Sequence, residues 1–119
     1  MNELLINLER DLKRRETGVK HDTGKSRLDL IPSEVLFALG DVLHEGSKKY
    51  GERNWEQGME WGRVYGALQR HLCKWWSGID LDEETGKSHL HHALANLAFL
   101  LSYEQRGIGT DTRNRPAKT

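Results

Sequence analysis

Cysteine is nearly absent from the 119-residue sequence, in which Cys73 stands alone. One thiol cannot build an internal disulfide framework, and such scarcity is typical of proteins from a reducing cytoplasm. Long apolar runs are absent as well, since none approaches the ~20 residues that span a bilayer. The N-terminal segment MNELLINLERDLKRRE carries charges throughout, unlike a signal peptide. We therefore expect a cytoplasmic protein without a membrane partner.

The sequence also lacks an excess of charge of either sign. Its 18 basic residues balance its 18 acidic residues, and the formal net charge is zero. A general binder of nucleic acid or of a membrane surface would carry a basic excess. We therefore expect neither partner, and the chain length predicts a single domain.

Proline occurs only twice, and leucine far outnumbers isoleucine and valine, which favours helices over strands. Apolar residues recur at helical spacing in four segments, namely 2–15, 33–49, 61–77 and 87–106. Asn2 and Ser33 are the expected N-caps of the first two, and the stripe Leu90, Leu94, Leu97 and Leu101 is expected to face the core in the last. These segments predict a compact all-α bundle of about four helices over residues 1–107, followed by a polar, mobile tail over 108–119. A bundle this small is expected to complete its core by oligomerising.

The polar loop after the first segment is rich in hydrogen-bond donors. Lys25 and Arg27 flank a flexible backbone at Gly24, a combination that suits phosphate binding. The spacing is not that of a Walker A motif. The alternative interpretation is a solvated basic loop without a ligand.

The segment 45–55 combines groups that can hold a metal, a polyphosphate and a flat base. It contains a carboxylate, two lysines, two aromatic rings and an amide, namely Glu45, Lys48, Lys49, Tyr50, Asn54 and Trp55. Either aromatic ring can stack on a base. The alternative is that Trp55 caps the bundle core and that the lysines form a solvated face.

Two further segments carry candidate ligands. Arg70 and His71 lie on the third predicted helix, where His71 falls on the inward face and is either a hydrogen-bonded core residue or part of a site. Before the fourth helix, an acidic run offers oxygen ligands for Mg²⁺ or Mn²⁺, although Asp82 or Thr85 can instead cap that helix. On the helix itself, one face presents His89, His92 and Asn96, and two histidines at this spacing can also bind Zn²⁺.

Taken in order, these strings form a longer pattern. It reads Lys20-His21-Asp22-x-Gly24-Lys25-x-Arg27-Leu28-Asp29-Leu30-Ile31-Pro32, then Gly46-x-Lys48-Lys49-Tyr50-Gly51-x-x-Asn54-Trp55, then Arg70-His71-Leu72, and then Gly78 with Asp82-x-Glu84-x-Gly86-x-x-His89-Leu90-x-His92-Ala93-x-x-Asn96. The pattern resembles the phage and bacterial dATP/dGTP diphosphohydrolase family of the MazZ type. That family is similar to the MazG-like all-α nucleotide pyrophosphohydrolases. The resemblance covers residues 20–107.

The resemblance implies a MazG-like bundle that assembles as a dimer or tetramer. It also implies cleavage of a purine deoxynucleoside triphosphate, dGTP or dATP, to the monophosphate and pyrophosphate, with two or three Mg²⁺ or Mn²⁺ ions. For a phage-encoded chain the implied location is the host cytoplasm. The E-x-x-E pattern of the wider MazG-like group is absent from this sequence. The implied metal ligands are therefore Glu45, Asp82 and Glu84, with Asp41, His89 and His92 as further candidates.

Several basic and polar residues receive roles by the same resemblance. Glu45, Asp82 and Glu84 are the expected catalytic acids, together with Lys49. The residues expected to contact the substrate are Lys25, Arg27, Lys48, Tyr50, Asn54, Trp55, Arg70, His71 and Asn96. Among them the cations would neutralise the leaving pyrophosphate, while the aromatic and amide groups would position the base or sugar.

Two other functions remain open at this point. The dipeptide His21-Asp22 is compatible with an HD-type triphosphohydrolase, which would release inorganic triphosphate and a nucleoside. That chemistry requires the pair on a helix, whereas the sequence predicts a loop there. The second alternative is a non-enzymatic helical adaptor that pairs through its apolar faces.

Overall fold

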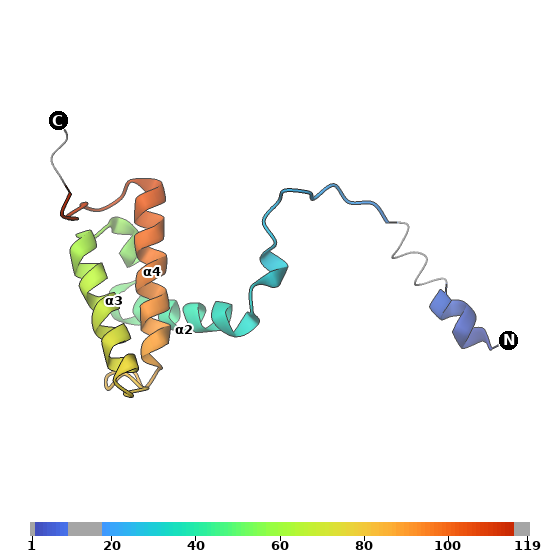
Figure 1. The fold of residues 1–119 in the computed structure, drawn as a ribbon, viewed down its shortest axis with the longest axis horizontal. Coiled ribbons are helices and arrows are strands. Elements are labelled where there is room, and N and C mark those ends of the chain that lie inside the picture. Colours follow the sequence, from blue (N-terminus) through green and yellow to red (C-terminus); the bar gives the residue numbers. More distant parts are fainter. Residues whose placement is uncertain (1, 10–17, 116–119) are drawn as a thin grey trace. The chain divides into compact units, whose positions relative to one another are not determined.

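The computed structural model describes residues 2–9 and 18–115 (Figure 1). The chain divides into two units, Met1–Leu30 and Ile31–Thr119, and each unit is described by itself. In the first unit, residues 3–9 are helical, and the side-chain Oδ1 of Asn2 accepts a hydrogen bond from the backbone N–H of Leu4 at 3.0 Å. Asn2 is therefore the predicted cap, while residues 10–15 of the predicted helix lie outside the described part. A 3-10 helix, η1 (Leu28–Leu30), ends this unit.

The second unit consists of helices and their connections. Its elements are α2 (Ser33–Tyr50), the 3-10 helix η2 (Asn54–Gln57), α3 (Trp61–Trp76) and α4 (His89–Arg106). Helices α3 and α4 run antiparallel side by side, and α2 crosses them and packs chiefly on α4 (Figure 1). The described residues contain no strand, only two isolated bridge contacts. The prediction of an all-α fold is confirmed, and none of the described helices is long and apolar enough to cross a membrane.

The ends of α4 are set by local signals. Ser88 caps its start, since the Ser88 Oγ accepts a hydrogen bond from the Leu90 N–H at 3.1 Å. Gly107 ends it in the left-handed conformation, at φ 67°, where glycine has no steric penalty. The expectation that Asp82 or Thr85 caps this helix is wrong, because the chain makes a further turn between those residues and Ser88.

The buried face of α4 differs from the predicted leucine stripe. Leu90, Leu97 and Leu101 are 41%, 54% and 53% exposed, whereas Ala93 and Ala95 are buried. Burial on α4 therefore falls on these small side chains and not on the leucines. The periodicity had indicated a helix correctly, but it did not identify which face meets the partner helix.

Tyr103 ties α4 to η2 at the centre of the core. Its side chain is completely buried, and its hydroxyl donates a hydrogen bond of 2.5 Å to the carbonyl oxygen of Trp55. The indole of Trp55 stacks on Phe99, with ring centroids 4.8 Å apart. This packing supports the interpretation of Trp55 as a core cap, and the stacking of Trp55 on a base stays a prediction.

The C-terminal segment is more ordered than its polar composition predicts. Thr110 forms two backbone hydrogen bonds with residues at the start of α3. Its carbonyl accepts from the Trp61 N–H at 2.9 Å, and its N–H donates to the Met59 carbonyl at 3.3 Å. The indole N–H of Trp61 donates to the Ile108 carbonyl at 2.9 Å, and the Thr112 hydroxyl accepts from the Gly62 N–H at 2.9 Å. The expectation of a mobile tail is therefore wrong for residues 108–112.

The Tyr103 hydrogen bond predicts a specific loss of stability. Tyr103→Phe keeps the ring but leaves the Trp55 carbonyl without its partner, so we expect the free energy of unfolding to fall by about 1–2 kcal/mol. Tyr65→Phe is the matched control, because Tyr65 is 52% exposed and its hydroxyl accepts a hydrogen bond from the neighbouring Gln69 side chain. Urea unfolding followed by circular dichroism measures both variants, and an equal loss in both would contradict the prediction.

The same residue predicts a dependence on alkaline pH. Burial raises the pKa of the Tyr103 phenol above its ordinary value. A phenol with a raised pKa in the folded state stabilises the fold fully below its unfolded pKa of about 10, and this contribution is lost as the pH rises through the folded pKa. We expect the wild type to lose stability between about pH 10 and pH 12 more steeply than Tyr103→Phe. Parallel curves for the two proteins would refute this role.

Candidate functional site

A charged cleft lies where the C-terminal end of α2 meets the loop between α3 and α4. It has a volume of about 360 Å³ and is lined by Glu45, Lys48, Lys49, Glu84 and Thr85. Lys49 Nζ lies 3.7 Å from Glu84 Oε1, and Lys87 Nζ lies 3.8 Å from Glu45 Oε1. Such exposed ion pairs contribute little stability. Breaking these pairs therefore costs little free energy, so the lysines are able to bind an anion and the glutamates a cation instead.

Asp82 organises the loop that carries Glu84 to this cleft. Its Oδ2 accepts hydrogen bonds from the Glu84 N–H at 3.2 Å, the Thr85 N–H at 3.0 Å and the Thr85 hydroxyl at 3.1 Å. The Asp82 backbone N–H also donates to the Lys87 carbonyl at 2.7 Å. A short aspartate side chain satisfies neighbouring backbone donors in this way and folds the acidic run into a tight turn.

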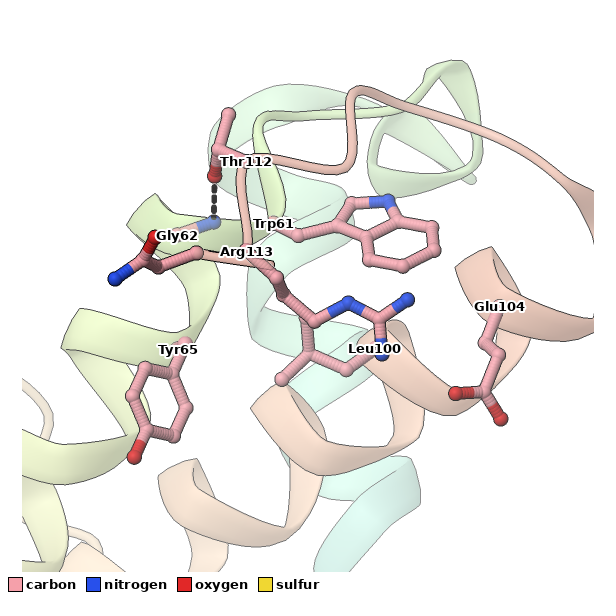
Figure 2. Close-up of a pocket in the computed structure, with 8 residues that line it drawn as sticks. Trp61, Gly62, Tyr65, Leu100, Glu104, Thr112 and Arg113 are labelled. Carbon is pink, nitrogen blue, oxygen red and sulfur yellow. Dashed lines mark hydrogen bonds between the residues drawn. The ribbon is translucent and has the colours of Figure 1, made fainter. Parts of the chain in front are cut away.

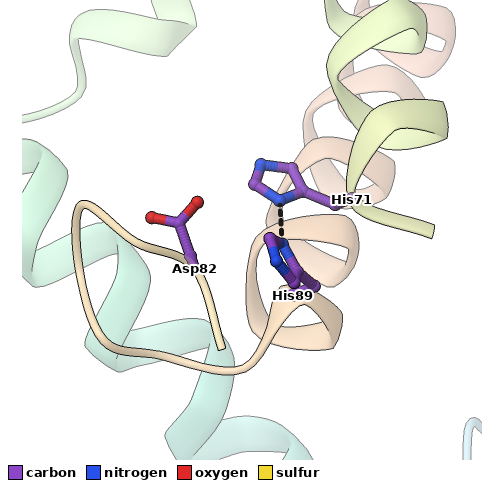
Figure 3. A group of neighbouring side chains, drawn as sticks. All are labelled: His71, Asp82 and His89. Atoms are coloured by element: carbon purple, nitrogen blue, oxygen red, sulfur yellow. Dashed lines mark hydrogen bonds between the residues drawn. The ribbon is translucent and has the colours of Figure 1, made fainter. Parts of the chain in front are cut away.

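Three histidines from α3 and α4 gather beside Asp82. The Nδ1 atoms of His71 and His89 lie 2.9 Å apart, and the His71 ring stacks on that of His92 with centroids 4.8 Å apart. Figure 3 shows the carboxylate of Asp82 facing the two imidazoles of His71 and His89. His71, Asp82 and His89 each offer one ligand atom, and these atoms all lie within 4.8 Å of one another. The group therefore has the composition and spacing of a metal-binding site.

Thr85 connects this histidine group to the charged cleft. Its Oγ lies 2.7 Å from His92 Nε2, donates to Asp82, and accepts from the Lys87 N–H at 3.2 Å. Because the hydroxyl has only one proton and gives it to Asp82, the His92 Nε2 must be the donor in its contact with Thr85. Thr85 thus determines the tautomer of His92 and holds the Asp82 carboxylate in place.

The surroundings shift the pKa values of His71, His92 and Asp82. Burial lowers the pKa of both His71 and His92, and neighbouring imidazoles add to the effect. Both rings are therefore neutral near pH 7. Burial by itself would raise the pKa of Asp82, but the hydrogen bonds from Thr85 outweigh it and the net pKa is lowered. An ionised carboxylate consequently faces neutral imidazoles, which are the forms that bind metal ions.

Many of the residues expected from the sequence lie in this region. The cleft contains Glu45, Lys48, Lys49 and Glu84, and the histidine group contains His71, Asp82, His89 and His92. Beside the cleft, the centroid of the Tyr50 ring lies 5.2 Å from Lys49 Nζ. The pKa of Lys49 is raised, chiefly by Tyr50 and to a smaller extent by the charge of Glu84. The Asn96 side chain donates to the His92 carbonyl at 3.0 Å.

Other expected residues are not brought into the cleft. Asp41 lies one turn earlier on α2, exposed and outside the cleft lining, and Asn54 is exposed on η2. Arg70 lies beside His71 on α3 with an exposed side chain. Lys25 and Arg27 belong to the first unit, where Arg27 forms two hydrogen bonds with Asp29, at 2.9 Å and 2.8 Å. Their role in substrate binding stays a prediction.

Sequence analysis assigned no role in the site to Thr85 or Lys87, which the structure places at the centre of the region. The D-x-x-T spacing from Asp82 to Thr85 is typical of a side-chain turn and is the signal that could have found Thr85. A second pocket, of about 430 Å³, was also missed (Figure 2). It is mostly apolar and lies between the starts of α3 and of the C-terminal segment, where Arg113 packs 5.0 Å from the Trp61 ring.

Comparisons with known proteins identify the family of the chain. Residues 15–113 match the family described as dATP/dGTP diphosphohydrolase, N-terminal. Over 84 residues the chain is 39% identical to a protein of Salmonella phage PMBT28 named dATP/dGTP diphosphohydrolase. The matched region covers 71% of this chain but only 29% of the phage protein. No solved structure matches the chain. The chain therefore belongs to the dATP/dGTP diphosphohydrolase, N-terminal family.

Proposed function

We propose that this protein hydrolyses a purine deoxynucleoside triphosphate, dATP or dGTP, to the monophosphate and pyrophosphate. Membership of the family and the name of the phage relative support the class of substrate. The observation that carries the proposal is the cleft in which Lys48 and Lys49 lie beside Glu45 and Glu84. A triphosphate requires cations for its phosphates, and hydrolysis requires a carboxylate near the attacked phosphorus.

Glu45 and Glu84, with Asp82 behind them, fit the binding of Mg²⁺ or Mn²⁺. These ions take oxygen ligands, usually one or two protein carboxylates together with substrate phosphates. Both glutamates are exposed in the cleft and form ion pairs with lysines at 3.7 Å and 3.8 Å, which can rearrange around an ion. When bound, two or three such ions would neutralise phosphate charge and lower the pKa of a bound water.

The residues of the chain then have separate tasks. Lys48 and Lys49 hold the phosphates and offset the negative charge that develops on the leaving pyrophosphate. Glu45 accepts the proton of the attacking water, because its carboxylate lines the cleft that would hold the phosphates. Glu84 orients Lys49 through their ion pair. Tyr50, at the rim and 62% exposed, is positioned to contact the sugar or base.

We also propose that the protein works as a homo-oligomer, a dimer or a tetramer. Leu90, Leu97 and Leu101 lie at spacings of seven and four residues and form one exposed stripe on α4. Contiguous exposed apolar side chains of this kind mark interaction surfaces. A second copy of the chain is the proposed occupant, since the same stripe is self-complementary about a two-fold axis and the zero net charge adds no repulsion between copies.

Product analysis with purified protein tests the activity. We expect dATP or dGTP with Mg²⁺ or Mn²⁺ to yield the monophosphate and pyrophosphate, separated by ion-exchange chromatography. Glu45→Gln should lower turnover by about 10²-fold or more, because the proton acceptor is lost. Glu34→Gln, a matched change in the first turn of α2, should leave turnover unchanged.

Three results would contradict this activity or the mechanism proposed for it. Release of inorganic triphosphate and a nucleoside would favour HD-type chemistry, although His21 and Asp22 lie outside any helix in the structure. Normal turnover in Glu45→Gln would remove Glu45 from the mechanism. Absence of turnover with every nucleotide, in protein shown to be folded, would favour the adaptor function.

Light scattering coupled to size-exclusion chromatography tests the oligomer. We expect the wild type to elute as a dimer or tetramer and Leu97→Glu to dissociate it, because a charge would be buried at the contact between copies. Leu36→Glu is the matched control, as Leu36 is equally exposed, at 55%, but lies on α2. A monomeric wild type, or equal dissociation by both variants, would refute the α4 stripe as the interface.

A further inference from the structure

We infer that the pocket between the start of α3 and the C-terminal segment binds a neutral purine nucleoside with a base of the guanine type. This pocket is separate from the charged cleft. Its residues Trp61 and Tyr65 lie at the start of α3, whereas the cleft is lined from the loop that follows the end of that helix. The inference does not rest on nucleotide hydrolysis, since it uses none of the residues that line the cleft.

The pocket has the size and the lining of a small-molecule site. Its volume of about 430 Å³ lies within the ~300–1,000 Å³ of typical ligand pockets, and its lining is mostly apolar. Figure 2 shows that Trp61 and Tyr65 come from α3, Leu100 and Glu104 from α4, and Arg113 from the C-terminal segment. Aromatic and aliphatic walls with a few polar groups are suited to a flat organic ring.

The C-terminal segment forms a fixed wall of the pocket. The Thr112 hydroxyl accepts a hydrogen bond from the Gly62 N–H at 2.9 Å, and a Cβ added at Gly62 would lie only 2.7 Å from that hydroxyl. This close contact requires glycine at position 62 and holds the segment against α3. The pocket is therefore formed before a ligand arrives, which lowers the entropic cost of binding.

Trp61 and Arg113 offer surfaces on which a planar base can stack. The Trp61 indole N–H is already bonded to the Ile108 carbonyl at 2.9 Å, so the ring contributes its faces rather than a donor. The Arg113 guanidinium lies 5.0 Å from the centre of the Trp61 ring. Nucleobases stack on aromatic rings and on guanidinium planes. A base therefore finds both kinds of stacking surface in one pocket.

The charges around the pocket favour a nucleoside over a nucleotide. Arg113 is neutralised by Asp111, to which it donates two side-chain hydrogen bonds of 2.9 Å. Glu104 also lines the pocket, and among the described residues no cation forms an ion pair with it. A phosphate beside Glu104 would be repelled, while Arg113 already has a carboxylate partner. The site thus lacks the free cation that a phosphate requires, and a neutral ligand fits better.

Glu104 also discriminates between purine bases. Its carboxylate only accepts hydrogen bonds, and its two oxygens can accept two parallel ones. Guanine presents a ring N–H and an amino group side by side, which matches this pair of oxygens. Adenine presents an amino group next to a ring acceptor, so one carboxylate oxygen would face a lone pair. Glu104 therefore favours guanine.

Equilibrium dialysis of the whole chain against radiolabelled deoxyguanosine, with a chelator present, tests the site. We expect one equivalent to bind per chain, and deoxyadenosine and deoxyinosine to bind about tenfold more weakly because each lacks one of the two donors. Glu104→Gln should weaken deoxyguanosine binding by about tenfold or more, since the charge-assisted hydrogen bonds are lost. Glu34→Gln, a matched change of an exposed acid on α2, should bind like the wild type.

A second variant tests the pocket by its shape. Leu100→Trp fills the cavity and keeps Glu104, so we expect it to abolish binding while circular dichroism shows an unchanged helical fold.

Four results would overturn the proposal. They are absence of binding by the wild type, wild-type affinity in Glu104→Gln, wild-type affinity in Leu100→Trp, and tighter binding of dGMP than of deoxyguanosine. The last result would place the ligand at the lysines of the cleft. Because neither metal nor triphosphate is present, an inactive protein that binds deoxyguanosine refutes only the hydrolysis, and an active protein that does not bind it refutes only this site.

Discussion

The close contact between α3 and α4 is the constraint on which the rest of the structure depends. Helices α3 and α4 approach each other closely, and Val64 of α3 and Ala93 and Ala95 of α4 are buried. This approach brings the His71 and His89 rings together. A change that separated the two helices would disperse the histidine group, because packed cores do not deform gradually.

Two chemical environments lie side by side at one end of this helix pair. The outer one is an exposed cleft of paired ammonium and carboxylate groups, suited to phosphates and to ions with oxygen ligands. The inner one is a partly buried group of imidazoles with a single carboxylate. Thr85 joins them, since it contacts both Asp82 and His92. A change in the cleft can therefore reach the histidines through one hydroxyl group.

Family membership and local chemistry explain different parts of the molecule. The family match extends from residue 15 to residue 113 and thus includes the packed C-terminal segment at Thr110. The chain nevertheless spans only 29% of the length of its phage relative. The E-x-x-E pattern is absent, and the structure brings Glu45 from the end of α2 and Glu84 from the loop before α4 to one cleft.

The sequence by itself determined the helical class, the approximate bounds of α2, α3 and α4, and most of the residues in the candidate site. Helical periodicity, capping residues and glycines at helix ends are local signals, and local signals can be read along the chain. Only the tertiary structure decided which face of α4 is buried and that Trp55 packs on the core. It also decided that His71 contacts both His89 and His92. It also decided that residues 108–112 are packed, because their contacts are backbone hydrogen bonds that leave no side-chain pattern. Such contacts depend on how distant helices approach one another, and that approach is set by packing across the whole unit.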